Sequence, residues 1–412
     1  MTASVVRAMD CWRRYDMGDR MGFLEEEISD LKKRGVFQAE QRALDSPSVA
    51  EMIVDGKKVI NLCSNNYLGL TNHPMLKDAE HRAIDEWGAG AGAVRPIIGT
   101  MRIHVELEEK LADFKGTESS LVFVAGIAAN RGTIQALIPG PENAVISDEL
   151  NHASIIDGVR LTKAKRFVYK HNDMNALEDA LKQAQGSARI MIITDGVFSM
   201  DGDIAPLPEI AELADRYGAF TMVDDAHASG VLGKGGRGTV SHYDLEGRWD
   251  IQMGTLSKGM GALGGYIAGS RNLTDFLRHT ARPFLFSTAH PPAVAAACIA
   301  AVELLESEEG EALVAKLWDN ARYFQGKLRD LGFDLGKTQT PITPLIIGGE
   351  EKTMNFSRKL YEEGVMGTGI VYPTVPRGTE RIRFMVSAMH EREHLDFAIE
   401  KIEKTAREFA VI

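Results

Sequence analysis

The sequence predicts an α/β fold: a mainly parallel β-sheet covered by helices on both faces, followed by a smaller C-terminal α+β domain. Between about residues 121 and 268, short apolar runs rich in Val and Ile alternate with helical patterns, as expected of buried parallel strands joined by helices. After about Arg282 the pattern changes to Ala-rich helices followed by new strands. A chain of 412 residues is also too long to fold around a single hydrophobic core, so more than one domain is expected. We therefore expect an N-terminal helix and arm (1–60), a large domain (61–300) and a small domain (301–412).

The first elements are a helix from about Gly22 to Arg34 and an extended arm after it. Buried strands of the large domain are predicted at Leu121–Val124, Ala144–Ile146, Arg166–Tyr169, Ile190–Thr194, Phe220–Val223 and Gly265–Ala268, with a further short run at Asp250–Met253. One connecting helix carries its apolar residues on a single face, at Leu207, Ile210, Ala211, Ala214 and Tyr217.

The small domain follows two helices, expected at about Pro292–Leu305 and Val314–Leu331. Its own elements are a strand at Pro344–Ile347, a helix near Met354–Glu363 and a strand at Ile382–Val386. The last helix places Leu395, Ala398, Ile399 and Ile402 on one face.

Composition restricts the classes of function. The net charge of −11 argues against a nucleic-acid partner, which requires a basic surface. No apolar run is long enough to span a bilayer, and residues 1–20 lack the apolar core of a secretory signal. Cys11, Cys63 and Cys298 are far apart and form neither a metal spacing nor a disulfide framework, so we expect a cytoplasmic protein without a structural metal.

Lys258 stands in a turn of small residues, Gly254-Thr255-Leu256-Ser257-Lys258-Gly259-Met260-Gly261, directly after a strand. Ligands of open parallel sheets lie beyond the carboxyl ends of the strands. A lysine placed there beside hydroxyl groups can form a Schiff base and lie near a phosphate, and burial favours its neutral, nucleophilic amine. Taken alone, Lys258 can equally be a solvated lysine of a glycine-rich loop.

Asp224 and His227 follow the strand Phe220–Val223 in the segment Val223-Asp224-Asp225-Ala226-His227. A buried carboxylate can keep the pyridine nitrogen of pyridoxal 5′-phosphate (PLP) protonated, which that coenzyme requires as an electron sink. We assign this role to Asp224, with His227 near the phenolic oxygen or beside Asp224. The alternative is a zinc site, which needs further ligands at a suitable spacing, and no second cluster appears.

Gly126 and Ile127 lie between the strand Leu121–Val124 and a helix, in Ala125-Gly126-Ile127-Ala128-Ala129-Asn130. A glycine at a helix N-terminus exposes backbone N–H groups to an anion such as the PLP phosphate. The alternative is an ordinary strand–helix turn. The glycines of Gly88-Ala89-Gly90-Ala91-Gly92 do not match the dinucleotide-binding spacing and follow a helical pattern, so we reject that function for them.

Two further strand ends carry polar residues. His152, in Asn151-His152-Ala153-Ser154, opens a helix, where its imidazole can stack on a flat cofactor. Equally, Asn151 can cap that helix and His152 can be a surface residue. Ser199, in the segment from Asp195 to Gly202, can reach the phenolic oxygen of the cofactor. Each residue is weak evidence by itself, but five strand ends of one sheet each offer a group that PLP needs.

At this point the sequence resembles the α-oxoamine synthases, a family of fold-type I PLP enzymes, over nearly the whole chain from about Gly22. The motifs are Ser64-Asn65-Asn66-Tyr67-Leu68-Gly69-Leu70, the run from Ser147 to Gly158, Thr194 to Gly202, and Val223 to His227. The resemblance implies a seven-stranded sheet, PLP as cofactor and a homodimer with shared active sites. The family usually has an aromatic residue where Ile127 stands, so packing there is expected to differ.

The resemblance assigns a role to each candidate residue. It implies that Lys258 is the Schiff-base lysine and general acid/base. Contacts to the coenzyme ring are implied for Asp224, His227, His152 and Ser199. Contacts to its phosphate are implied for Thr255, for the amides of Gly126 and Ile127, and, from the neighbouring subunit, for Ser287 and Thr288.

The resemblance also implies the substrates, a small amino acid and an acyl-CoA. Arg383, in Arg381-Ile382-Arg383, matches the arginine that binds the amino-acid carboxylate, for which a bidentate guanidinium is suited. We expect Asn65 to be a second substrate contact. Within the family we expect a glycine C-acetyltransferase acting on glycine and acetyl-CoA. The alternative is an 8-amino-7-oxononanoate synthase acting on alanine and a pimeloyl thioester, or a promiscuous member. A PLP aminotransferase or lyase on the same fold is the alternative from another class.

Overall fold

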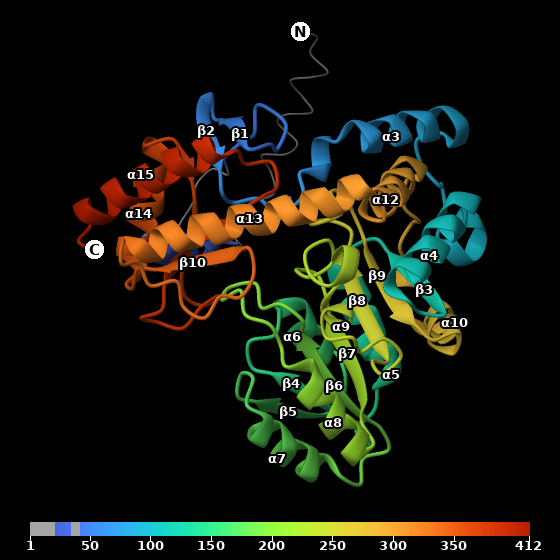
Figure 1. Cartoon of the computed structure of the whole chain (residues 1–412). Coiled ribbons are helices and arrows are strands. Elements are labelled where there is room, and N and C mark those ends of the chain that lie inside the picture. Colours follow the sequence, from blue (N-terminus) through green and yellow to red (C-terminus); the bar gives the residue numbers. More distant parts are fainter. Residues whose placement is uncertain (1–20, 34–41) are drawn as a thin grey trace, which may run out of the picture.

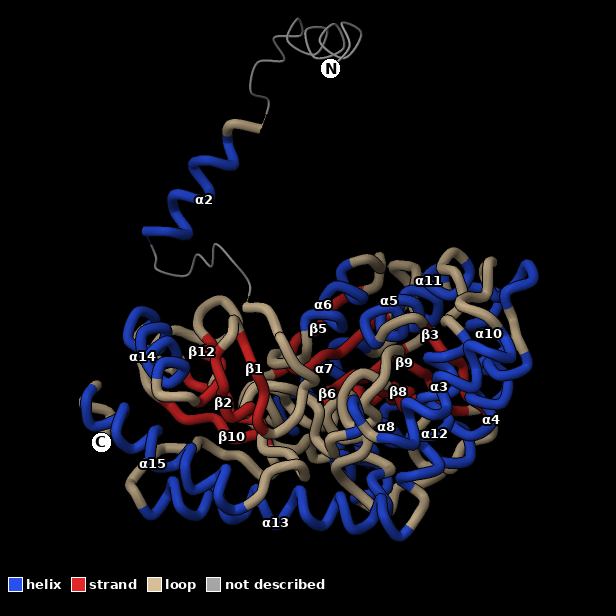
Figure 2. The backbone as a smooth tube through the Cα atoms, turned by 90° about the horizontal axis from the view of Figure 1, so that it is seen from above, coloured by secondary structure: helices blue, strands red, loops and turns tan. Residues whose placement is uncertain are grey.

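The computed structural model describes residues 21–33 and 42–412 (Figure 1). The first helix of the described part, α2 (Phe23–Lys33), matches the expected helix, buries none of its residues and stands apart from the folded body in Figure 2. Much of the arm predicted after it lies outside the described residues. In the part of the chain that is described, no helix has the length and apolar character of a bilayer span.

The large domain is built on a seven-stranded sheet with the spatial order β3-β9-β8-β7-β6-β4-β5. Its strands are β3 (Ser119–Phe123), β4 (Ala144–Asp148), β5 (Lys165–Tyr169), β6 (Ile190–Asp195), β7 (Phe220–Asp224), β8 (Ile251–Thr255) and β9 (Gly265–Gly269). Only β9 among them runs antiparallel to its neighbours, β3 and β8. The predicted mainly parallel sheet of seven strands is therefore confirmed.

Helices cover both faces of this sheet because alternate residues of each strand point to opposite sides. Met191 and Ile193 of β6 pack with one cluster of helices, α5 (Gly126–Leu137), α6 (Ala153–Arg160), α10 (Arg271–Thr280) and α11 (Arg282–Leu285). Ile190 and Ile192 of the same strand face α7 (Met174–Ala184) and α8 (Leu207–Tyr217). Four of the five residues predicted for the apolar face of α8 are fully buried, and Tyr217 packs against them.

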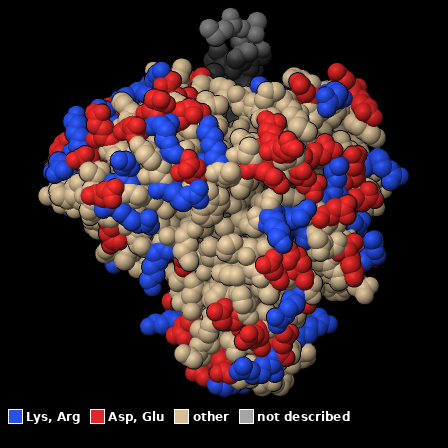
Figure 3. Space-filling model, in the orientation of Figure 1, with Lys and Arg blue, Asp and Glu red and all other residues tan. Residues whose placement is uncertain are grey.

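Three further helices share an apolar cluster with the strands β3 and β9 of the sheet. The apolar helix α12 (Pro292–Leu305) packs on α3 (Pro74–Trp87) and α4 (Arg102–Lys115). Short elements join these parts: η2 (Leu70–Asn72), η3 (Arg95–Gly99), η4 (Lys234–Gly236) and α9 (Thr239–His242). Acidic and basic side chains are interspersed on the face shown in Figure 3.

The small domain follows the long helix α13 (Glu308–Asp330), which runs past both parts of the molecule (Figure 1). It contains an antiparallel sheet, β10-β13-β12, and two helices. Their bounds are β10 (Ile342–Ile346), α14 (Glu350–Glu362), β12 (Thr368–Ile370), β13 (Arg381–Met385) and α15 (Arg392–Glu408).

The N-terminal strands also belong to the small domain, which differs from the expected boundary at residue 60. Strand β1 (Glu51–Val54) pairs with β2 (Lys57–Asn61), and β2 pairs in parallel with β11 (Val365–Met366). The side chains of Ile60 and Leu62 are buried in the apolar cluster of the C-terminal helices and strands. The order of the elements in the sequence did not predict this arrangement, because β2 and β11 lie near opposite ends of the chain.

A fully buried ion pair fixes the segment that directly follows β7 in the sequence. The Lys115 amine lies 2.9 Å from Oδ2 of Asp225, and both side chains have no exposed surface. The same amine donates to the carbonyl of Arg237, and the carboxylate accepts from the amide and hydroxyl of Thr239. A buried charge that loses its partner is strongly destabilising. The pair therefore anchors the segment from Asp225 to Thr239 against α4.

We predict that Lys115→Met lowers the free energy of unfolding by about 3–5 kcal/mol, because Asp225 would remain buried without its cation. Lys110→Met on the same helix is the control. It removes a partly exposed pair with Glu303 at 2.9 Å and should cost under about 1 kcal/mol. Urea unfolding followed by far-ultraviolet circular dichroism measures both changes, and equal midpoints for the two variants would contradict the assignment.

Candidate active site

The six parallel strands of the large sheet end at one edge, and most of the residues predicted for the site lie at or just after five of these ends. The segments lie after β3, β4, β6, β7 and β8. Asp195 and Asp224 are register partners on the adjacent strands β6 and β7. The edge therefore brings together side chains that are far apart in the sequence.

Lys258 follows the end of β8 and is partly buried. Burial lowers the pKa of its amine to about 8, although the charges of Asp224 and Asp195 act in the opposite direction and that of Arg383 in the same direction. At this pKa a sizeable fraction of the amine is neutral near pH 7.5, and the neutral amine is the nucleophilic form. Lys258 lies just after the end of β8 and Asp224 at the end of β7, and these two strands are adjacent and paired.

Asp224, the last residue of β7, is buried and firmly held. Its Oδ1 accepts a hydrogen bond from the amide of Ala226 at 2.9 Å, and its Oδ2 accepts one from Nδ2 of Asn130 at 2.7 Å. The Asn130 amide also reaches Oγ of Ser154 at 2.8 Å. The sequence analysis assigned no function to Asn130, although its position one helical turn after Gly126 places it over the same sheet edge.

His227 is buried, and its Nδ1 lies 2.8 Å from the Tyr67 hydroxyl. Burial lowers the pKa of His227 well below its ordinary value, and the charges of Lys258 and Arg383 lower it further. Burial raises the pKa of Tyr67. The pair is therefore a neutral imidazole and a neutral phenol. Tyr67 lay in a motif that carried the family resemblance, but no role had been assigned to it.

His152 caps α6 itself, since its Nδ1 accepts a hydrogen bond from the Ser154 amide at 3.2 Å. Burial lowers the pKa of His152, opposed by the charge of Asp224 and assisted by that of Lys258. Asn151, the alternative cap, has a different function. It joins β4 to β6 through hydrogen bonds with the carbonyl of Ile193 and the amide of Asp195.

Asp195 is a site residue for which the sequence analysis made no assignment. Its Oδ2 accepts a hydrogen bond from the His152 amide at 2.9 Å. Burial raises the pKa of Asp195 well above its ordinary value, and the neighbouring charge of Asp224 raises it further. The sequence signal was present, because Asp195 opens the quoted segment that ends at Gly202.

Gly126 begins α5, and the residue before it provides no side-chain cap. A Cβ on Gly126 would lie 3.1 Å from Cε of Met253 and 3.5 Å from Oγ1 of Thr255, so the helix N-terminus and Thr255 adjoin each other. The Thr255 hydroxyl lies 2.8 Å from the carbonyl of Gly264. The side chain of Ile127 is exposed, so the predicted change in packing at this position falls on the surface of the chain.

Arg383 joins the small domain to the sheet edge. Its Nη1 donates to the carbonyl of Ser199 at 3.1 Å, while its Nε is buried and has no hydrogen-bond partner among the described residues. The side-chain oxygen of Asn65 is likewise buried and unpaired there. Spare donors on a guanidinium fit an incoming carboxylate.

Ser287 and Thr288 lie in a different setting from the other predicted residues. Thr288 forms an isolated bridge with Val94, and both residues line a small cavity with Arg95 and Val124. Their contact with a neighbouring subunit stays a prediction.

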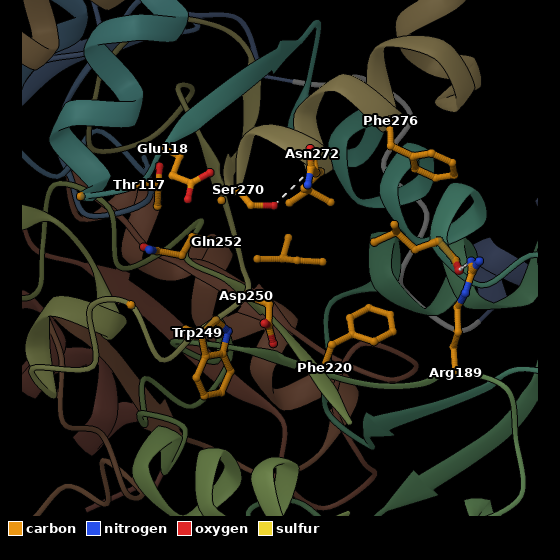
Figure 4. A pocket seen from close by; sticks show the side chains of 16 residues that line it. Thr117, Glu118, Arg189, Phe220, Trp249, Asp250, Gln252, Ser270, Asn272 and Phe276 are labelled. Carbon is orange, nitrogen blue, oxygen red and sulfur yellow. Dashed lines mark hydrogen bonds between the residues drawn. The ribbon is translucent and has the colours of Figure 1, made fainter. Parts of the chain in front are cut away.

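A separate cavity of about 600 Å³ lies at the opposite edge of the sheet (Figure 4). It is lined by Phe220 and Ile251, the first residues of β7 and β8, whereas Asp224 and Thr255 end those strands. None of the predicted site residues lines it. The candidate site is therefore defined by converging side chains and not by this cavity.

The residues at the sheet edge fit PLP in their chemistry. They include an amine of lowered pKa, a buried carboxylate held by two N–H donors and an uncapped helix N-terminus suited to a phosphate. A metal centre does not fit as well, because Asp225 faces Lys115 while His227 faces Tyr67. Among the described residues, no three His, Cys, Asp or Glu side chains form a group that could hold a metal.

Comparison with known proteins agrees with this chemistry. Residues 57–402 match the family of class I and II aminotransferases. Relatives named 8-amino-7-oxononanoate synthase from Thermoanaerobacter pseudethanolicus and Symbiobacterium thermophilum are 58% and 56% identical, each over 95% of this chain and over 98% and 99% of their own lengths.

Solved structures also resemble this chain over nearly its whole length. Serine palmitoyltransferase from Sphingomonas wittichii is 31% identical and superposes with a TM-score of 0.90 over 96% of this chain and 100% of its own. A serine palmitoyltransferase from S. paucimobilis, 30% identical with the same TM-score and coverage, contains bound PLP.

These relatives correct one expectation and confirm others. The expected branch was glycine C-acetyltransferase, whereas the relatives with 54–58% identity bear the name of the alternative, 8-amino-7-oxononanoate synthase. The fold, the PLP cofactor and the acyltransferase class are as predicted. The chain belongs to the class I and II aminotransferase family and, within it, to the PLP-dependent α-oxoamine synthases of fold type I.

Proposed function

We propose that this enzyme condenses alanine with a pimeloyl thioester to form 8-amino-7-oxononanoate, with release of the thiol and carbon dioxide. The observation that carries the proposal is the 58% identity to an enzyme of that name over 95% of the chain. The site supports it, because an amine, a carboxylate and a guanidinium converge at one sheet edge. Glycine and acetyl-CoA, the substrates that the sequence analysis favoured, serve as the comparison pair in the activity assay that tests this proposal.

PLP, when bound, supplies an electron sink for negative charge at the α-carbon of the amino acid. In our proposal, Arg383 binds the carboxylate of the amino acid through its spare N–H donors, with Asn65 beside it. The neutral amine of Lys258 removes the α-proton. The α-carbon then bonds to the carbonyl carbon of the thioester, the C–S bond breaks, and the thiolate leaves. Loss of the carboxylate as carbon dioxide leaves an electron pair at the α-carbon, and protonation of that carbon by the Lys258 ammonium completes the product.

The other residues hold the coenzyme in this proposal. Asp224, fixed by Asn130 and Ala226, faces the ring nitrogen. The Tyr67 hydroxyl donates a hydrogen bond to Nδ1 of His227, which leaves Nε2–H to reach the phenolic oxygen, near Ser199. His152 stacks on the ring. The amides of Gly126 and Ile127, with Thr255, contact the phosphate.

We further propose a homodimer in which Ser287 and Thr288 contact the phosphate of the neighbouring subunit. A surface patch beside them supports it. Ile97, Ile98 and Phe286 have exposed fractions of 78%, 80% and 68%, and the bridge between Val94 and Thr288 joins the two segments that carry them. Exposed apolar residues gathered on one surface are typical of a protein interface.

The substrate proposal predicts that alanine with a pimeloyl thioester releases free thiol at least about tenfold faster, in kcat/KM, than glycine with acetyl-CoA, because added methylenes in an apolar site each favour binding. A matrix of amino acids and acyl thioesters, read by a thiol reagent without any keto acid, measures this. Lys258→Ala is the control and should release none. Preference for acetyl-CoA would overturn the substrate assignment, and a requirement for a keto acid would indicate transamination.

The lowered pKa of Lys258 predicts the pH dependence of its reaction with PLP. In the cofactor-free enzyme, the rate of PLP capture, trapped with borohydride, should rise with pH and level off above about 8, because only the neutral amine reacts. Asp224→Asn removes a charge that raises this pKa, so the midpoint should move to lower pH. A rate that still rises beyond pH 10 would indicate an ordinary lysine.

The shared site predicts complementation between two defective chains. Lys258→Ala and the double variant Ser287→Ala/Thr288→Ala should each be impaired. A random mixture of the two chains should contain about a quarter of the wild-type number of intact sites, because half of its dimers are heterodimers and each heterodimer has one intact site of two. Activity of co-expressed chains, with sedimentation to establish the oligomer, measures the recovery. An active monomer, or a mixture no better than its components, would contradict the arrangement.

A further inference from the structure

The ring of His171 lies between two carboxylates at the candidate site's sheet edge. Its Nδ1 is 3.0 Å from Oδ1 of Asp148, and its Nε2 is 2.7 Å from Oδ2 of Asp203. Asp148 ends β4, His171 follows β5, and Asp203 follows the segment after β6. One side chain therefore links three segments of this edge. The predicted site residues do not include it.

The ring can donate to both carboxylates only as the imidazolium, because a neutral imidazole has a single N–H. Burial lowers the pKa of His171, but the hydrogen bonds and charges of Asp148 and Asp203 outweigh this effect and raise it to about 10. The side chain of Asp148 is fully buried and that of Asp203 is 10% exposed. Removal of one partner from a shielded pair of this kind costs more than removal from a surface pair, because the other charge is left buried.

The first carboxylate fixes the turn that carries His152. Besides His171, Asp148 accepts hydrogen bonds from the amides of Leu150 at 2.9 Å and Asn172 at 3.0 Å. The amide of His171 itself donates to Glu149 at 3.0 Å. The turn 148–152 is thereby held against the end of β5.

The second carboxylate fixes the loop that carries Ser199. The backbone carbonyl of Asp203 accepts from the amide of Phe198 at 3.1 Å, and the ring of Phe198 meets that of His171 edge-on at 4.4 Å. The carbonyl of Ser199 in turn accepts from Arg383. Among the described residues, Oδ2 of Asp203 accepts, apart from His171, only from the side-chain Nδ2 of Asn172 at 3.1 Å, and its Oδ1 has no hydrogen-bond partner.

We propose that His171 is a positioning residue: its doubly hydrogen-bonded ring holds the turn 148–152 and the loop 198–203 in the one arrangement in which His152, Ser199 and Arg383 face the same coenzyme. This rests on the roles proposed above for those three residues. His171 touches no reacting atom and acts through the two segments that it joins. Loss of the ring leaves Asp203 with one neutral donor, so the loop loses its fixed position.

The test compares His171→Gln with His279→Gln. His279 is exposed on α10, and within the described part of the chain its ring forms a hydrogen bond to the carbonyl of Asp275 in its own helix, at 2.8 Å. For His171→Gln we expect PLP binding to the cofactor-free protein to weaken about tenfold, the visible circular dichroism of bound PLP to fall, and KM for the amino acid to rise more than kcat falls. The control should match the wild type in all three.

A second variant keeps the proposal testable if His171→Gln folds poorly. Asp203→Asn preserves the ring and its bond to Asp148 but removes the charge on the loop. It should weaken PLP binding in the same direction by a smaller factor. Unchanged PLP affinity and dichroism in a folded His171→Gln or Asp203→Asn protein would overturn the proposal. Because PLP binding is measured without substrate, this result is independent of whether the wild type accepts pimeloyl or acetyl thioesters.

Discussion

Parallel strands end at the same edge of a sheet, and the candidate site depends on this constraint. The segments after β3, β4, β6, β7 and β8 meet there, so Gly126 adjoins Thr255 and Asn130 reaches Asp224. The core keeps the strands in register, because both faces of the sheet are buried and a slip of one residue would exchange those faces. Catalytic geometry therefore depends on the packing of apolar side chains, as in the opposed faces of β6.

Burial then sets the protonation of groups that are alike in solution. It lowers the pKa of His152 and of His227, whose ring lies against Tyr67. His171 lies between two carboxylates and has a raised pKa instead. A neutral imidazole can accept a hydrogen bond, as His227 does from Tyr67, whereas an imidazolium only donates. In our proposals, histidine contacts the coenzyme at positions 152 and 227, whereas at position 171 it holds the surrounding loops in place.

The small domain completes the site from the other side. Arg381 pairs with Asp201 at 2.6 Å, and the Thr340 hydroxyl donates to the carbonyl of Gly202 at 2.9 Å. Together with Arg383, these contacts hold the loop after β6 against the C-terminal domain. The same loop is bound to the large sheet through Asp203 and His171. Arg383 therefore lies where the two domains meet, and the placement of the substrate that we propose for it depends on both domains.

Much of this was determined by the sequence alone. Alternating apolar runs and helical patterns predicted the parallel sheet, and polar residues at strand ends predicted Lys258, Asp224 and His152, because strand period and strand ends are local properties of the chain. Only the tertiary structure decided contacts between distant segments. These contacts include the antiparallel pairing of β9 and the pairing of β2 with β11. They also include the hydrogen bonds of Asn130, Tyr67 and His171 to their partners. Such pairings depend on packing in three dimensions, for which neighbouring residues in the sequence carry no signal.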